Sequence, residues 1–314
     1  MRLRLYFCLI CLLGASHALA ADNSRVLTTI KPLQQIAAAV MDGVDSPALL
    51  MEPGASPHTY ALRPSDRRAL AAAERIYWVG PELELFLEDL LERQENSVAL
   101  LHLPQMSVRE QLQSHNFQQE EPSGHAGHDT HGQEHDHGHD HGSLDPHIWL
   151  SPTNARAIAR YMAEDLASVY PQQSDQLQAN LAVFEQRLAA VDASLQARLN
   201  VLQDKPYFVF HDGYGYFEDH YGIRPQGIFS LSHEVQPGAR HVNQLRQQLQ
   251  AAGPSCVFTE PQFTPRLVNS LTEGLPVSVG VLDPLGSAIE VGPKGYERTL
   301  EDIAGALASC LETL

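Results

Sequence analysis

Short apolar runs along the chain alternate with longer segments in which apolar residues recur at helical spacing. The runs have the length and boundaries of buried strands, and most of the longer segments begin at Pro or Ser, with Ser65 and Ser174 as expected N-caps. The predicted strands are 26–30, 48–51, 76–79, 98–101, 207–210, 227–229, 256–259 and 277–281. The predicted helices are 32–41, 65–74, 81–93, 152–170, 174–202, 239–252, 265–273 and 296–311. This alternation predicts an α/β protein with parallel sheets covered by helices.

The helix predicted over 174–202 is long for a globular protein and contains neither Gly nor Pro. Its apolar stripe is formed by Leu177, Leu181, Phe184, Leu188, Val191, Leu195 and Leu199. We interpret it as a rigid strut that joins two lobes, each a mostly parallel sheet with flanking helices. An ordinary core helix or a coiled-coil segment is the alternative. The stripe covers too few heptads to favour self-association, so we expect a monomer.

The first twenty residues have the pattern of an export signal. Arg2 and Arg4 precede the apolar run 5–13, and small residues flank the expected cleavage site after Ala20. The run is too short to anchor the chain in a bilayer, and no later segment is long and apolar enough to cross one. The sequence therefore predicts an exported protein with no membrane span after cleavage.

These observations divide the chain into four parts. The predicted parts are a signal peptide at 1–20, an N-terminal lobe at 21–170 with a His-rich loop at 115–143, a linking helix at 171–202 and a C-terminal lobe at 203–314.

Two cysteines, Cys256 and Cys310, remain after the signal is removed. An even pair in an exported chain predicts one disulfide. It would close a loop of roughly 55 residues and stabilise the fold by about 4 kcal/mol on the chain-entropy model. Two independent buried thiols are the alternative, and a zinc site is disfavoured because neither cysteine has a second one close in sequence.

The formal net charge is −17, and removing the signal, which holds two arginines and no acid, makes it −19. Such an acidic chain argues against nucleic acid as a partner, because nucleic acid requires a basic surface. It suits a protein whose ligand is a cation.

A His-rich segment, GHAGHDTHGQEHDHGHDHG, occupies residues 124–142. Its histidines are His125, His128, His131, His135, His137, His139 and His141. The segment has no large apolar residue that could build a core. Imidazoles and carboxylates at this density can bind divalent metals such as zinc, nickel or copper weakly, through several alternative sets of ligands. A solvated linker that is His-rich by drift is the alternative.

Four potential metal ligands lie just beyond predicted strands or at the start of the long helical region. His58 and His147 belong to the N-terminal lobe, and His211 and Asp283 belong to the C-terminal lobe. Ligands of such sheets bind at the carboxyl ends of strands, and three imidazoles with one carboxylate make a tetrahedral zinc set. Each residue taken alone has an ordinary structural explanation, such as a loop cap or an Asp-Pro turn. Their joint placement, two in each lobe, favours a metal site in an interlobe cleft.

The sequence here resembles a known family. The stretches PGASPHTYALRPSDRRAL, WVGPELE, DPHIWLSP, FHDGYGYFE, CVFTEPQF and VLDPLG are similar to the periplasmic zinc-binding proteins of bacterial ABC zinc importers, the ZnuA type of the cluster 9 (A-I) solute-binding family. The resemblance spans nearly the whole mature chain. It implies a metal held between two α/β lobes joined by a long helix, a periplasmic location and an inner-membrane ABC permease as the partner.

The resemblance also assigns residues. It implies that His58, His147 and His211 are ligands, and His rather than Glu at position 211 favours Zn²⁺ over manganese. Asp283 matches an acidic fourth ligand of the wider group. Some zinc members have an acid just before the first His, where this chain has Pro57, so the fourth ligand is expected to be Asp283 or a water. The family pairs cysteines that match the two of this chain and commonly carries an acidic His-rich loop.

Three functions are compatible with these residues. The first is a receptor, not an enzyme, that captures Zn²⁺ and delivers it to a permease for high-affinity zinc uptake. The second is a zinc hydrolase with three His ligands and Asp283 as its base, although no hydrolase motif supports it. The third is a metal buffer that acts through the His-rich loop alone. Glu260 and Glu234 are expected to support the site or the fold rather than to bind metal.

Overall fold

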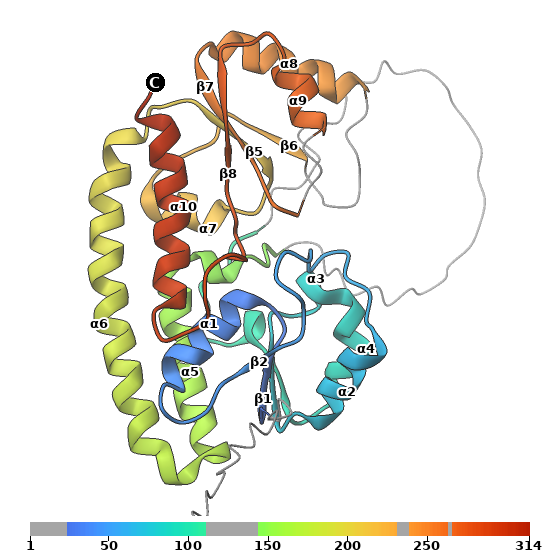
Figure 1. Cartoon of the computed structure of the whole chain (residues 1–314), viewed down its shortest axis with the longest axis vertical. Helices are drawn as coiled ribbons and strands as arrows, with labels where there is room; N and C mark the ends of the chain where they lie inside the picture. Colours follow the sequence, from blue (N-terminus) through green and yellow to red (C-terminus); the bar gives the residue numbers. More distant parts are fainter. Residues whose placement is uncertain (1–23, 111–143, 231–238, 263–265) are drawn as a thin grey trace, which may run out of the picture.

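The computed structural model describes residues 24–110, 144–230, 239–262 and 266–314. The predicted signal peptide, the seven histidines of the His-rich segment and Glu234 lie outside these described residues. Within them, the chain forms two α/β lobes stacked along the long axis of the molecule, as the sequence predicted (Figure 1).

The N-terminal sheet has four parallel strands in the order β2-β1-β3-β4. These strands are β1 (Val26–Thr28), β2 (Ala48–Leu49), β3 (Arg75–Trp78) and β4 (Ser97–Ala99). The helices that accompany them are α1 (Lys31–Val40), α2 (Pro64–Ala72), α3 (Pro81–Glu84) and α4 (Glu88–Leu91). Strands β1 and β3 are buried along all or nearly all of their length, which explains why their sequences are mostly apolar rather than alternating.

The C-terminal sheet repeats this strand order as β6-β5-β7-β8, again wholly parallel. Its strands are β5 (Tyr207–His211), β6 (Gly227–Ser230), β7 (Ser255–Thr259) and β8 (Val277–Val281). Its helices are α7 (Gly215–Tyr221), α8 (Ala239–Ala252), α9 (Arg266–Thr272) and α10 (Gly295–Leu311). A disulfide between Cys256 and Cys310 joins β7 to α10, which confirms the predicted pairing.

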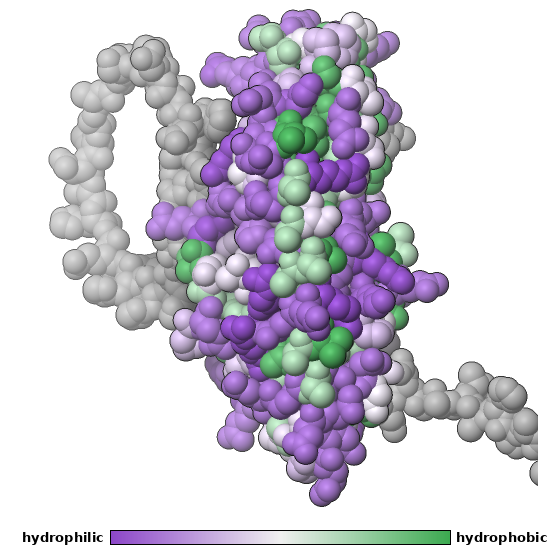
Figure 2. Space-filling view, turned by 90° about the vertical axis from the view of Figure 1, so that its left-hand side faces the viewer, coloured by the Kyte–Doolittle hydropathy of each residue, from purple (hydrophilic) through white to green (hydrophobic). Residues whose placement is uncertain are grey.

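Helices α5 (Pro152–Val169) and α6 (Ser174–Leu199) connect the lobes. The predicted stripe of α6 is buried at Leu177, Phe184, Leu188, Leu195 and Leu199 and partly buried at Leu181 and Val191. The helix joins the lobes, as predicted, and packs against α5, α1 and α10 (Figure 1). Its outer side is largely hydrophilic, and hydrophobic residues reach the surface there in small separate spots (Figure 2).

The last helix, α10, crosses from the C-terminal lobe onto α1 of the N-terminal lobe and onto α6. Arg187 of α6 pairs with Glu297 of α10 at 2.8 Å. The hydroxyl of Thr299 donates to the amide oxygen of Gln35 of α1 at 2.9 Å. Apolar residues of both lobes accordingly belong to a single buried cluster.

Four details differ from the sequence-based expectations. Helix α2 begins at Pro64 with Arg63 as N-cap, because the Asp66 carboxylate accepts the Arg63 backbone N–H at 2.8 Å; Ser65 is not the cap. Helix α6 likewise begins at Ser174 with Gln173 as N-cap.

The single helix predicted over 81–93 is divided into α3, a 3₁₀ turn (Leu85–Leu87) and α4. Leu83, Leu87 and Leu91 are buried at helical spacing, which is why the pattern predicted one helix. Glu84 leaves helical geometry (φ −119°, ψ 52°) because its buried carboxylate turns back to accept the Val79 backbone N–H at 2.7 Å.

Helix α7 was not predicted, because its Gly- and Tyr-rich sequence reads as a loop. It follows β5 directly and ends at Gly222, whose φ of 70° is the left-handed conformation of a helix C-cap. No helix among the described residues is both long and apolar enough to cross a membrane.

Candidate metal centre

Three of the four predicted ligands converge between the lobes. His58 lies on the Gly- and Pro-rich loop after β2, His147 directly precedes the 3₁₀ turn Ile148–Leu150, and His211 is the last residue of β5. One ring nitrogen from each lies within 4.8 Å of the other two, and no other such group of potential ligands occurs among the residues that the structure describes. His147 and His211 are buried, and His58 is partly buried.

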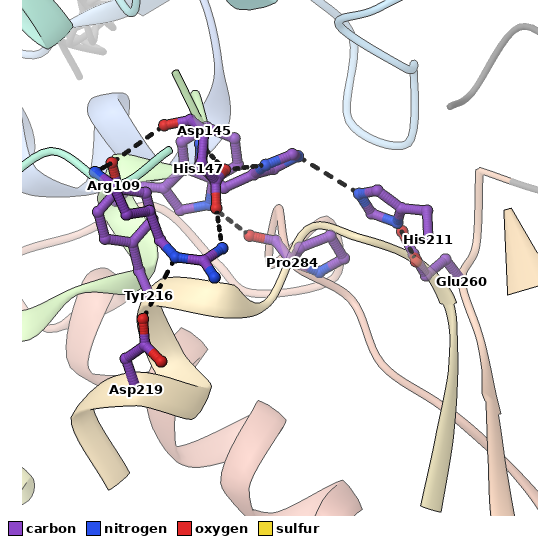
Figure 3. Close-up of polar contacts among 9 residues, drawn as sticks. Arg109, Asp145, His147, His211, Tyr216, Asp219, Glu260 and Pro284 are labelled. Carbon is purple, nitrogen blue, oxygen red and sulfur yellow. Dashed lines mark hydrogen bonds and ion pairs between the residues drawn. The ribbon is translucent and has the colours of Figure 1, made fainter. Parts of the chain in front are cut away.

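The ring of His147 is held by a carboxylate two residues earlier. Oδ1 of Asp145 lies 2.7 Å from Nδ1 of His147 and also accepts the His147 backbone N–H at 3.0 Å (Figure 3). Asp145 is fully buried. Burial opposes ionisation of its carboxyl, but hydrogen bonds from His147 and Arg109 outweigh burial and keep its pKa below the usual value. The carboxylate therefore keeps the proton of His147 on Nδ1 and points Nε2 towards the other lobe.

The ring of His211 is held in the same way from the C-terminal lobe. Its Nδ1 hydrogen-bonds the buried carboxyl group of Glu260, which directly follows β7 (Figure 3). Gly213 packs against the other side of the ring. A Cβ atom at this position would lie 2.2 Å from Nε2 of His211, so any side chain there would displace the nitrogen that faces the site.

The two pinned rings face each other through Nε2, at 3.3 Å (Figure 3). Both Nδ1 atoms are bonded to carboxyl groups, so neutral rings in this tautomer present two lone pairs to each other. These lone pairs repel each other, and a cation bound between the two nitrogens would remove the repulsion. Two nitrogens bound to one tetrahedral Zn²⁺ at 2.0–2.1 Å lie about 3.3 Å apart, which is the separation found.

Burial favours the neutral form of His58 and of His211. Desolvation, followed by repulsion from the neighbouring rings, holds the pKa of His58 well below its usual value. The pKa of His211 is lowered in the same way, first by burial and then by His147. A neutral imidazole is the form that binds a metal, so these rings are available as ligands over a wider pH range than free histidine.

Asp283 lies outside the group of three. Its carboxylate caps its own turn, with Oδ2 accepting the Ser287 backbone N–H at 2.6 Å and Oδ1 accepting that of Leu285 at 3.1 Å. The Nε2 amide of Gln262 donates to Oδ1 at 3.3 Å. The structure thus brings the three histidines together and keeps Asp283 beside them, occupied as a turn carboxylate.

Three residues support the ligands, and only one of them, Glu260, was singled out from the sequence. Glu260 was expected to support the site, and its contact with His211 agrees with that. Asp145 was not singled out, although a carboxylate two residues before a ligand His is a readable signal. Arg109, which donates to Asp145 at 2.6 Å, carries no local signal because 36 residues separate the pair. His220, another C-terminal histidine, pairs with Asp192 of α6 at 2.7 Å, apart from the group of three.

Comparisons with known proteins fit this geometry. A family model described as "ZnuA: Zinc-uptake complex component A periplasmic" matches residues 26–310. The high-affinity zinc uptake system protein ZnuA of Yersinia pestis is 42% identical over 299 residues, with 92% of each chain covered. The protein of that name from Brucella abortus is 36% identical over 324 residues, covering 94% of this chain and 93% of the relative. A crystal structure of ZnuA superimposes with a TM-score of 0.72 at 23% identity, over 91% of this chain and 98% of that one.

Proposed function

This chain belongs to the family of the periplasmic component A of zinc-uptake complexes, and from that premise we propose that it captures Zn²⁺ between its lobes and delivers it to an ABC permease. The protein is a solute-binding component that works in the periplasm. His58, His147 and His211 hold the ion, and Asp283 or a water takes the fourth position.

One observation carries the proposal, the convergence of three ring nitrogens from both lobes. Two of them stand at the spacing of neighbouring ligands on a tetrahedral zinc ion, each backed by a buried carboxyl group. Nitrogen donors suit Zn²⁺ better than they suit manganese. The engagement of Asp283 in its own turn supports a water in the fourth position.

Metal titration followed by native mass spectrometry tests the site. The wild-type protein is expected to bind one ion tightly, beyond any weak binding by the His-rich segment, and His58→Ala, His147→Ala and His211→Ala are each expected to lose the tight ion. His220→Ala is the matched control, because this histidine belongs to the C-terminal lobe but pairs with Asp192. Tight binding that survives all three ligand variants contradicts the proposal.

The His-rich segment offers a competing explanation of metal binding, a buffer that acts without the cluster. Deletion of residues 124–142 distinguishes the two, since it removes all seven histidines of the segment and leaves the three of the cluster. We expect the tight site to remain and the weak binding to disappear. Loss of all binding would favour the buffer.

We propose that the protein has no enzymatic activity, although a three-His zinc site with an open position also occurs in hydrolases. The base assigned to Asp283 in that alternative already accepts hydrogen bonds on both carboxylate oxygens. Zinc-loaded protein is expected to turn over neither a test ester nor a test peptide. Turnover that disappears in His211→Ala would favour the hydrolase.

We further propose that the chain is divided into an N-terminal lobe at 21–170, a linking helix at 171–202 and a C-terminal lobe at 203–314. The two lobes move little when the metal binds, and the protein acts as a monomer. Contacts across the lobes support this. The Nζ of Lys31 donates to the Ser287 carbonyl at 2.8 Å, and Nε1 of Trp149 donates to the Pro284 carbonyl at 2.8 Å. Small-angle scattering profiles with and without Zn²⁺ should superimpose and give a monomer mass. A marked compaction or a dimer mass contradicts this part of the proposal.

A further inference from the structure

Arg109 lies close to the metal centre in space but belongs to none of the three segments that carry the ligands. Its backbone carbonyl accepts the Asp145 N–H at 2.9 Å, and the next residue, Glu110, forms an isolated antiparallel bridge with Leu144. These contacts place Arg109 alongside the segment that leads into His147.

The guanidinium of Arg109 joins two acids that come from different lobes. Nη1 donates to Oδ2 of Asp145 at 2.6 Å, and Nε lies 3.2 Å from Oδ2 of Asp219 of α7 (Figure 3). Only 19% of the Arg109 side chain is exposed, and Asp145 is fully buried. The carboxylate of Asp145 is therefore shared, with Oδ1 on His147 and Oδ2 on Arg109.

The first turn of α7 is shaped to receive this side chain. A Cβ atom on Gly215 would fall 1.6 Å from Nη1 of Arg109, so a glycine is needed beneath the guanidinium. The hydroxyl of Tyr216 accepts the Arg109 backbone N–H and donates to the Asp145 carbonyl, each at 3.0 Å. Thus α7, which follows the strand that bears His211, holds both Arg109 and Asp145.

We infer that Arg109 is a positioning residue for the metal centre, which fixes the carboxylate of Asp145 against His147 and ties that segment to α7 of the opposite lobe. The inference rests on the proposed function, because it concerns the same Zn²⁺ site. Arg109 does not touch the ion. It sets the ring of His147 at the distance from His211 that the ion requires.

The chemistry of the side chain supports this role. A planar guanidinium can donate to two carboxylates at fixed angles, whereas a lysine ammonium is a point charge on a flexible stem. Removing the guanidinium charge leaves the buried Asp145 with only His147 as a side-chain partner, so the carboxylate loses the contact that sets its orientation. Groups that orient a metal-binding histidine typically change metal affinity by about 10- to 100-fold when they are removed.

The experiment measures Zn²⁺ affinity by chelator competition in the full-length protein. We expect Arg109→Gln to weaken binding by about 10- to 100-fold and Arg109→Lys to recover part of that loss. Arg187→Gln is the matched control, because Arg187 also bridges the lobes through a partly buried ion pair, with Glu297, but away from the site. Its affinity is expected to stay within about threefold of wild type.

A double-mutant cycle separates positioning from a general effect on the fold. If Arg109 acts through Asp145, then Arg109→Gln added to Asp145→Asn weakens binding little further than Asp145→Asn alone. The visible absorption of the Co²⁺-loaded protein gives a second readout, since a displaced His147 changes the tetrahedral ligand field. We expect Arg109→Gln to change this spectrum and Arg187→Gln to leave it unchanged.

Several results would overturn the inference. Wild-type affinity in Arg109→Gln is one, and full additivity with Asp145→Asn is another, because Arg109 would then act by a different route. If Arg109→Gln does not fold, the Zn²⁺ affinities of Arg109→Lys and Arg187→Lys are compared instead. A weaker affinity in Arg109→Lys supports the inference, and equal affinities overturn it. Failure of the proposed function is recognised separately, since the wild-type protein itself would then show no tight site that depends on His147 and His211.

Discussion

The three histidines of the centre differ in how they are held. His147 and His211 are buried, and each has its Nδ1 on a buried carboxyl group. His58 is only partly buried and lies on a loop that contains Gly54, whose φ of 87° is a left-handed turn conformation. Two ligands are thus set in place by the surrounding core, and the third is carried by a surface loop.

This difference indicates how the centre can be both selective and accessible. The pinned pair already has the separation that a tetrahedral ion needs, so little ordering cost falls on these rings when metal binds. The loop that carries His58 also lines a small pocket between the lobes together with Lys31 and Leu285.

The two sheets add a second lesson. Their strand orders are the same, yet the ligands leave them at different places, with His58 following the outer strand β2 and His211 ending the inner strand β5. Glu260 follows the other inner strand, β7. The repeated architecture therefore does not generate a symmetric site, because the N-terminal lobe contributes two of the histidines and the C-terminal lobe one, each lobe with its own supporting carboxyl group.

Removal of single ligands gives the largest expected effect and tests the contrast directly. Each of His58→Ala, His147→Ala and His211→Ala should weaken Zn²⁺ binding by more than about 100-fold, because losing a ligand exceeds the cost of losing a group that only orients one. The losses for His147 and His211 should be greater than that for His58, since the preset pair is broken. Chelator competition measures all three affinities. An equal or larger loss of Zn²⁺ affinity in His58→Ala would show that the pinned pair does not contribute more to binding than His58.

Removing a supporting carboxyl group should have an intermediate effect. Glu260→Gln keeps a hydrogen-bond acceptor for Nδ1 of His211 but replaces the carboxyl group that orients the ring by an amide, so affinity should fall by about 10- to 100-fold. Glu273→Gln is the control, as this glutamate is exposed in the same lobe. Affinity that is unchanged in Glu260→Gln would mean that the His211 ring is held by its packing alone.

The fold could be predicted from sequence to a large extent because it depends on periodic features. Strand β8 and helix α8 have the predicted bounds, and most other elements differ by only a few residues. The errors occur where one residue overrides the pattern, as when Glu84 breaks the predicted helix over 81–93 to reach the Val79 N–H. Helix α7 was missed because glycines at 213 and 215 are typical of a loop. Gly213, just before the helix, allows the close approach of His211, and Gly215, its first residue, allows that of Arg109.

The site could be predicted only in part. His58, His147 and His211 follow strands or precede a helix, which is a local signal that sequence retains. The contact between Arg109 and Asp145 arises from folding across 36 residues and leaves no such signal. The same limit applies to Asp283, whose position suggested a ligand but whose carboxylate is engaged in its own turn.

Asp283→Asn therefore has a smaller expected effect than any change at the pinned pair. The turn already engages both carboxylate oxygens, and an amide retains one of them as an acceptor, so Zn²⁺ affinity should fall less than about tenfold. Loss of one turn hydrogen bond should lower the free energy of unfolding by about 1 kcal/mol. Chelator competition and denaturant unfolding measure the two effects. A loss above 100-fold, as large as that for His58→Ala, would establish Asp283 as the fourth ligand in place of a water.

Acidification should produce the smallest effect. Two imidazoles with the usual pKa near 6.5 would each be half protonated at pH 6.5, which would weaken metal binding about fourfold relative to pH 8. Burial lowers the pKa of both His58 and His211, so these rings stay neutral at pH 6.5 and their contribution to that loss should be smaller.

The same shifts act on the metal-free fold with a definite sign. Below pH 6.5 the unfolded chain takes up protons on His58 and His211 that the folded protein excludes, so the free energy of unfolding should fall as pH decreases from 6.5 towards the lowered pKa values. Above about pH 7.5 both states carry neutral rings, and these residues add no further pH dependence. Denaturant unfolding of the metal-free protein at pH 8, 6.5 and 5.5 measures this dependence, with the double variant His58→Ala/His211→Ala as control. A decrease of the same size in the control would show that other groups cause it and that burial does not keep these two rings neutral.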